Sequence, residues 1–238
     1  MTCSTPKTIL SSLALSSTLL FSQVTNAQYI DLYAFSGFLS DGTSIYQDDS
    51  FDIDNIGFST FTPDFTTSFT ATLDADNYGT LNWKVINKTG ATIEDAQIVT
   101  LLDAAIFDDE FDWDVSDDMA DPYSGTTASS WEVAEGLDLA NNLPFDLTLF
   151  DSIALPSFFS TGLALGFDVG DFYDYGVLDV TLTLSPTGPG LHLYDDANPG
   201  FYLDGTVSVP EPQTLALFLS ILGGITLFRR KLVKQESQ

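Results

Sequence analysis

The stretch FTTSFTATLDADNYGTLNWKV, residues 65–85, decides the fold. Apolar residues alternate with Ser and Thr in residues 65–73, and with Asn82 and Lys84 in residues 81–85. This period of two predicts two β-strands, each with one buried side and one solvent-facing side. The residues between them, DADNYG, are rich in the Asp, Asn and Gly that dominate tight turns, so a β-hairpin is one interpretation of the whole stretch.

The same pattern extends through most of the sequence. Strands are predicted at residues 29–38, 98–102, 145–150, 163–169, 179–184, 191–194 and 201–207. Gly- and Pro-containing turns separate them, and the only helix expected is a short one within residues 103–121. Many short strands joined by such turns predict an all-β fold, a β-sandwich of immunoglobulin-like or jelly-roll-like type. We expect one such ectodomain over residues 28–207.

Charge separates this ectodomain from the two ends of the chain. Only Lys84 and Lys88, of seven Lys and Arg, lie between residues 28 and 209, whereas all but two of the 34 acidic residues lie there. So acidic a domain is not expected to bind nucleic acid or another anionic surface, because both require positive charge. Its many aromatic and aliphatic residues predict a folded domain nonetheless.

The N-terminus has the features of a secretory signal peptide. A single charge, Lys7, precedes an apolar run, and Thr25-Asn26-Ala27 ends in the small residue that signal peptidase requires. We expect residues 1–27 to be removed by cleavage between Ala27 and Gln28. The only cysteine, Cys3, would leave with this peptide, so no disulfide is expected afterwards.

The C-terminus carries a second hydrophobic segment with a fixed order of parts. Pro210, Glu211 and Pro212 come first, and two prolines so close hold this stretch extended, as a protease cleft requires. An uncharged run containing Gly223 and Gly224 follows, and Arg229, Arg230 and Lys231 close it. The run, about 214–228, is predicted to be a short transmembrane helix with its basic end in the cytoplasm. An ordinary membrane anchor is the alternative.

This order resembles the PEP-CTERM sorting signal, over residues 208–231 with a cytoplasmic tail at 232–238. The residues that match are Pro210, Glu211, Pro212, Gly223, Gly224, Arg229 and Arg230. The resemblance implies that the protein is a substrate of exosortase, a membrane-embedded cysteine transpeptidase. It also implies a transient anchor in the inner membrane, cleavage near Pro-Glu-Pro, and delivery to the cell surface or extracellular matrix together with exopolysaccharide.

Calcium binding is one interpretation of two acidic patterns in the sequence. Asp52 with Asp54, and Asp74 with Asp76, begin matching D-x-D-N-x-G stretches, which are similar to the start of a calcium loop but equally typical of hairpin turns. The EF-hand pattern then fails, because neither stretch has Glu at position twelve. In the run from 108 to 121, alternate acids including Asp112 and Asp114 form either a calcium site or a solvated loop.

Catalytic patterns are weak by comparison. His192 is the only histidine, and it lies in a predicted strand, facing opposite two leucines, with no G-x-S-x-G motif. Glu132 and Glu135 are the least generic acids for a glycosidase, but acids are too abundant here to indicate a pair. The three tryptophans are candidates for stacking on sugars, although core packing is the other interpretation: Trp83, Trp113 and Trp131.

These features together predict an exported protein that is not an enzyme. We expect a secreted, exosortase-sorted protein of the cell surface or extracellular matrix, associated with exopolysaccharide. The first alternative is a calcium-dependent carbohydrate-binding β-sandwich, and a more distant one is an extracellular hydrolase. Exosortase, the inner membrane and exopolysaccharide are the expected partners, nucleic acid is not one, and calcium is the only cofactor left open.

Overall fold

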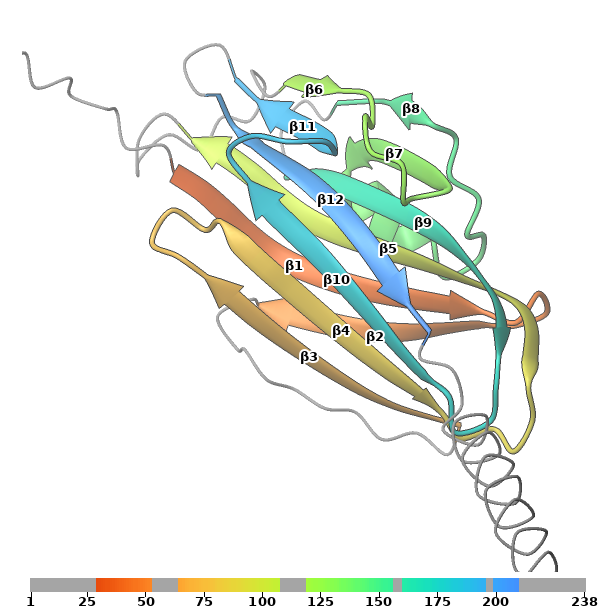
Figure 1. Cartoon of the computed structure of the whole chain (residues 1–238). Helices are drawn as coiled ribbons and strands as arrows, with labels where there is room; N and C mark the ends of the chain where they lie inside the picture. The colour runs from red at the N-terminus through yellow and green to blue at the C-terminus, as the bar shows by residue number, and fades with distance from the viewer. Residues whose placement is uncertain (1–28, 53–63, 108–118, 156–159, 196–198, 210–238) are drawn as a thin grey trace, which may run out of the picture.

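The computed structural model describes residues 29–52, 64–107, 119–155, 160–195 and 199–209, and it shows two stacked β-sheets (Figure 1). The first sheet has the order β2-β1-β5-β9-β7-β8. Its strands are β1 (Tyr29–Ser40), β2 (Ile45–Asp52), β5 (Ile93–Phe107), β7 (Ser130–Glu135), β8 (Ser152–Ile153) and β9 (Thr161–Phe172).

The second sheet has the order β3-β4-β10-β12-β11-β6. Its strands are β3 (Phe65–Leu73), β4 (Gly79–Asn87), β6 (Met119–Asp121), β10 (Val177–Ser185), β11 (Leu191–Tyr194) and β12 (Phe201–Ser208). Paired strands are antiparallel throughout the described residues, except β7 and β8. The prediction of an all-β sandwich is therefore confirmed.

The hairpin predicted from residues 65–85 is formed by β3 and β4. Phe69 pairs with Trp83 across it, and both side chains are buried in the core between the sheets. A Cβ atom at Gly37, in β1 of the opposite sheet, would lie 2.6 Å from the Trp83 ring. The indole of one sheet therefore packs directly on the backbone of the other, and this close approach requires glycine at position 37.

The outer faces of the two sheets are covered differently. A short helix, α1 (Gly136–Asn142), lies on the outer face of the first sheet, where Leu139 and Leu143 pack against a second apolar cluster that includes Leu101. Under α1 this sheet is buried on both faces, and so all seven residues of β9 from Thr161 to Phe167 are buried. In β10 of the second sheet, mostly buried and more exposed residues alternate instead.

Two local predictions were not confirmed. The described parts of residues 103–121, at 103–107 and 119–121, are strand, whereas residues 108–118 lie outside the described residues, so the helix predicted within 103–121 is tested only in part. A helix that was not predicted, α1, follows at Gly136–Asn142. The strand predicted at 145–150 was wrong, because these residues form no strand. Side chains take the backbone donors that a sheet would use: Thr148 N–H donates to Asp146, and Phe150 N–H donates to Glu132.

Candidate functional site

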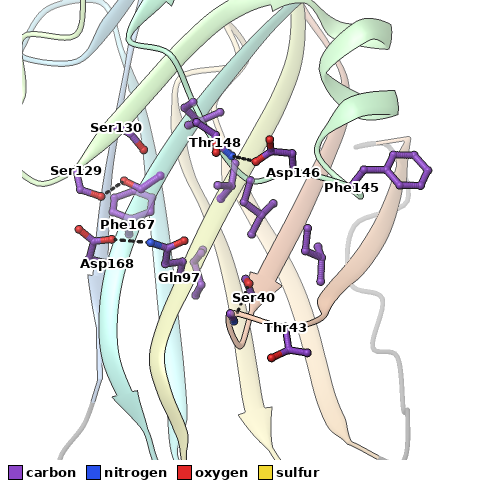
Figure 2. A pocket seen from close by; sticks show the side chains of 17 residues that line it. Ser40, Thr43, Gln97, Ser129, Ser130, Phe145, Asp146, Thr148, Phe167 and Asp168 are labelled. Atoms are coloured by element: carbon purple, nitrogen blue, oxygen red, sulfur yellow. Dashed lines mark hydrogen bonds between the residues drawn. The ribbon is translucent and has the colours of Figure 1, made fainter.

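A groove of about 560 Å³ lies on the outer face of the first sheet, beside the part that α1 covers (Figure 2). Its floor is formed by β5 and β9, and its sides by the β1–β2 turn, residues 129–130 and residues 145–149. The volume is within the range of ordinary ligand sites, about 300–1,000 Å³. The groove is thus the candidate functional site of the described sandwich.

The register of the sheet places the floor residues in rows across neighbouring strands. Ser40 of β1 pairs with Gln97 of β5, and Gln97 pairs with Asp168 of β9, so three polar side chains stand side by side. The Gln97 amide donates to Asp168 at 3.5 Å. In the next row, Gly166 has no side chain, and a Cβ atom there would lie only 2.2 Å from Ser130 Oγ. The missing side chain keeps the floor hollow.

The wall over residues 145–149 has an apolar inner side and a polar rim. Leu149 is buried in the second apolar cluster, which attaches the wall to the sheet. Asp146 and Thr148 are exposed at the rim, and the pKa of Asp146 is lowered by hydrogen bonds from the side chain and the backbone N–H of Thr148. Phe145 also stands at the rim, 86% exposed, and offers an unusually accessible aromatic ring.

Two acids fix the far end of this wall. Glu132 accepts the Phe150 N–H at 3.3 Å, and Asp151 accepts the Trp131 N–H at 2.8 Å. Burial raises the pKa of Glu132, and the bond from Phe150 partly opposes that shift. Glu132 thus has a local structural task.

The calcium candidates fall into two groups. Asp74 and Asp76 lie in the β3–β4 turn, where Asp74 Oδ1 accepts the backbone N–H groups of Asp76 and Tyr78 at 3.0 Å each. Asn77 adopts a positive φ of 61° there, so this stretch is the hairpin turn. Asp52 ends β2, whereas Asp54, Asp112 and Asp114 lie outside the described residues. Within the described ranges, no three His, Cys, Asp or Glu are grouped so as to hold a metal ion.

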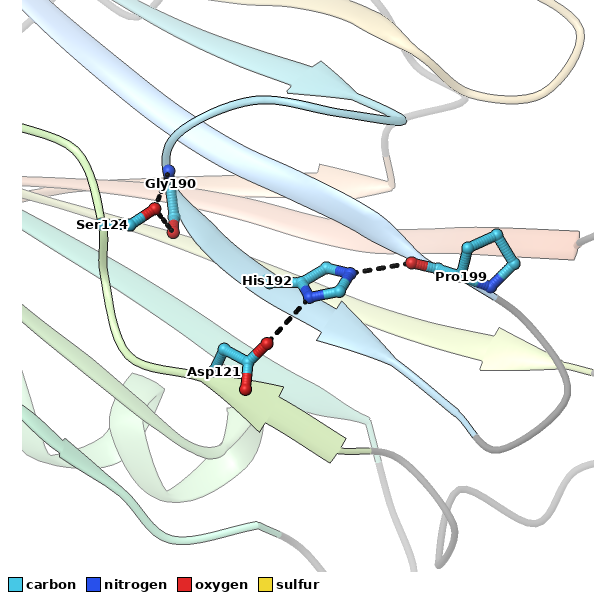
Figure 3. Close-up of polar contacts among 5 residues, drawn as sticks. All are labelled: Asp121, Ser124, Gly190, His192 and Pro199. Carbon is cyan, nitrogen blue, oxygen red and sulfur yellow. Dashed lines mark hydrogen bonds and ion pairs between the residues drawn. The ribbon is translucent and has the colours of Figure 1, made fainter.

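His192 is held in a polar network at the edge of the second sheet (Figure 3). Its Nδ1 lies 3.1 Å from Asp121 Oδ2, and its Nε2 lies 2.8 Å from the Pro199 carbonyl oxygen. Ser124, the nearby hydroxyl, bonds instead to both backbone groups of Gly190. The nitrogen that would take a serine proton therefore faces a carbonyl, so these three side chains are not arranged as a catalytic triad.

Two of the three tryptophans lie in or against the core between the sheets. Trp83 is buried and donates its Nε1–H to Asp48 at 2.9 Å, which confirms its role in the core. Trp131 is partly buried against the same core. Trp113 lies outside the described residues, as do the cleavage residues Ala27 and Gln28 and the sorting residues from Pro210 to Arg230.

Neither the groove nor its floor was predicted from the sequence. Gln97, Ser129 and Asp168 belong to no motif. The register of β5 on β9 brings Gln97 beside Asp168, and hydrogen bonds to the Gly166 carbonyl oxygen place Ser129 at the same groove. One feature of the sequence could have indicated the groove. The continuous apolar run in residues 163–167 is typical of a strand that is covered on both faces, and the layer that covers the outer face can form the wall of a groove.

Comparison with known proteins gives no relative. No family model matches the sequence, and neither a curated protein nor a solved structure matches the chain. Among the residues that the structure describes, no helix is both long and apolar enough to cross a membrane. The predicted helix at about 214–228 lies outside them.

Proposed function

We propose that the protein is an exported, non-enzymatic component of the cell surface or extracellular matrix that associates with exopolysaccharide. In this proposal a signal peptide is removed after Ala27. Exosortase then acts on the C-terminal segment after a transient stay in the inner membrane. The acidic sandwich is the part that is delivered.

One observation carries the proposal. All twelve described strands, from β1 to β12, lie between Gln28 and Pro210, so no described strand contains a predicted cleavage site. Cleavage at both predicted sites would therefore leave every described strand intact, which supports a sandwich that is released from both terminal segments.

Mass spectrometry of the protein recovered from the cell surface tests the proposal. The mature chain should begin at Gln28 and lack residues 229–238. Replacing Pro210 and Pro212 together by Ala should leave the unprocessed chain in the membrane. Pro186→Ala, in a turn of the sandwich, is the matched control and should be processed normally. Surface protein that retains Arg230 would refute the sorting proposal.

A further inference from the structure

We propose that the groove on the outer face of the first sheet binds a segment of an uncharged, hydroxyl-rich polysaccharide, without a metal ion. The inference rests on the association with polysaccharide proposed above, and it adds the place of binding and the chemical class of the ligand. It does not depend on how the protein is sorted, because the purified chain carries the same groove.

The lining offers hydrogen-bonding groups of every kind that a sugar hydroxyl can use. A hydroxyl both donates and accepts, and so do the Ser, Thr and Gln side chains, whereas a carboxylate only accepts. Eight such side chains line the groove: Ser40, Thr43, Gln97, Ser129, Ser130, Asp146, Thr148 and Asp168. An apolar ligand would leave these groups without water or partners, at a cost for each buried group. A polyhydroxylated ligand replaces the lost water contacts.

The charge of the lining selects among polysaccharides. Asp146 and Asp168 line the groove, and the described lining includes no Lys or Arg. Hydrogen bonds from Thr148 lower the pKa of Asp146, which favours its ionised form. A uronic acid, sulfate or phosphate group would therefore meet like charges with no compensating cation nearby. Neutral sugars are favoured, and acidic polymers are repelled.

Phe145 supplies the apolar part of the site. Its ring is 86% exposed at the rim, although a phenylalanine in a soluble domain is usually buried. One face of a pyranose ring is made of C–H groups, so it can cover this aromatic ring and remove both surfaces from water. The polar floor and the aromatic rim together match the two kinds of surface that a neutral sugar has.

Binding of the purified full chain to soluble polysaccharides, in excess EDTA, tests the inference. Dextran, amylose, mannan and galactan are the neutral probes, and alginate and polygalacturonate are the anionic ones. At least one neutral polymer should bind, and the anionic ones should not. Phe145→Ala should weaken binding about tenfold or more, as for an interface anchor. Asp168→Ala should weaken it several-fold by removing an acceptor.

Matched controls separate binding from folding. Phe150→Ala removes another exposed ring that does not line the groove, and Asp171→Ala removes another exposed acid of β9. Both should bind like the unaltered chain. No binding to any neutral polymer, a preference for the anionic ones, a need for added calcium, or equal losses in variants and controls would each overturn the inference. None of these outcomes bears on processing at Gln28 or Pro210, so the sorting proposal is tested separately.

Discussion

The two sheets share one core but differ on their outer faces. The second sheet presents a polar surface to solvent, with Lys84 3.3 Å from Asp179 and Thr181 hydrogen-bonded to Asn82. The first sheet presents a second apolar cluster, which α1 and residues 143–149 cover. The groove lies where this cover ends. A sheet with one wet face needs no further layer, whereas a sheet with two apolar faces acquires a cover whose edge can form a site.

The largest expected effect comes from the covered face of the first sheet. Leu101→Ala removes a side chain that is 2% exposed and packs in the cluster under α1, so it should lower the free energy of unfolding by about 2–5 kcal/mol. Thr183→Ala, on an exposed position of β10, is the matched control and should change it by about 0.5 kcal/mol or less. Thermal unfolding of the full chain measures both variants. Equal effects would show that the two outer faces do not differ in this way.

A buried acid on the same face makes stability depend on pH. Asp103 of β5 is largely buried, and its Oδ1 has no hydrogen-bond partner among the described residues. Burial raises the pKa of Asp103, and a hydrogen bond from Ser160 partly opposes the shift. The folded state therefore favours the protonated acid. Protonated Asp103 therefore stabilises the fold relative to ionised Asp103. This stabilisation is complete below the pKa of aspartate in the unfolded chain, about 3.9, and is lost as the pH rises through the higher pKa of Asp103 in the folded chain.

Asp103→Asn should remove this dependence. The variant should be more stable than the unaltered chain at pH 7, by about 1–3 kcal/mol, because it has no charge to desolvate. At pH 3.5 the difference should be small. Unfolding midpoints measured from pH 3.5 to 7 check this, with Asp138→Asn, an exposed acid of α1, as the control. A variant less stable than the unaltered chain at pH 7 would mean that the ionised carboxylate is needed.

The strands of the two sheets were predictable from the sequence to different degrees. The alternation in residues 65–73 and 179–184 predicted β3 and β10. In a sheet with one solvent-facing side, apolar and polar residues alternate along each strand, so the sequence shows which side is buried. The cover of the first sheet was not predicted. Apolar and polar residues alternate in residues 145–150 as in a strand, but two of their backbone N–H groups donate to the side chains of Asp146 and Glu132 and not to a neighbouring strand. The groove floor was missed because Gln97 and Asp168 are distant in sequence and meet only through register.

The smallest expected effect lies at the exposed edge of the second sheet. Asp121 Oδ2 is 3.1 Å from His192 Nδ1, but the Asp121 side chain is 58% exposed. When His192 is protonated, an ion pair in such surroundings contributes about 0–1 kcal/mol, because water and salt screen the charges. Asp121→Asn keeps the shape of the side chain, so it should lower the free energy of unfolding by less than about 1 kcal/mol, and by less still in high salt.

The histidine of the same pair provides the contrast. Its ring stacks on Tyr202, with ring centroids 4.0 Å apart, and its Nε2 contacts the Pro199 carbonyl oxygen. His192→Ala removes these contacts as well as the pair, so it should destabilise the chain more than Asp121→Asn does. Thermal unfolding of both variants at two salt concentrations gives the comparison. If Asp121→Asn costs as much as His192→Ala, the charge rather than the packed ring holds β6 on β11, and the outer edge of the second sheet depends on electrostatics.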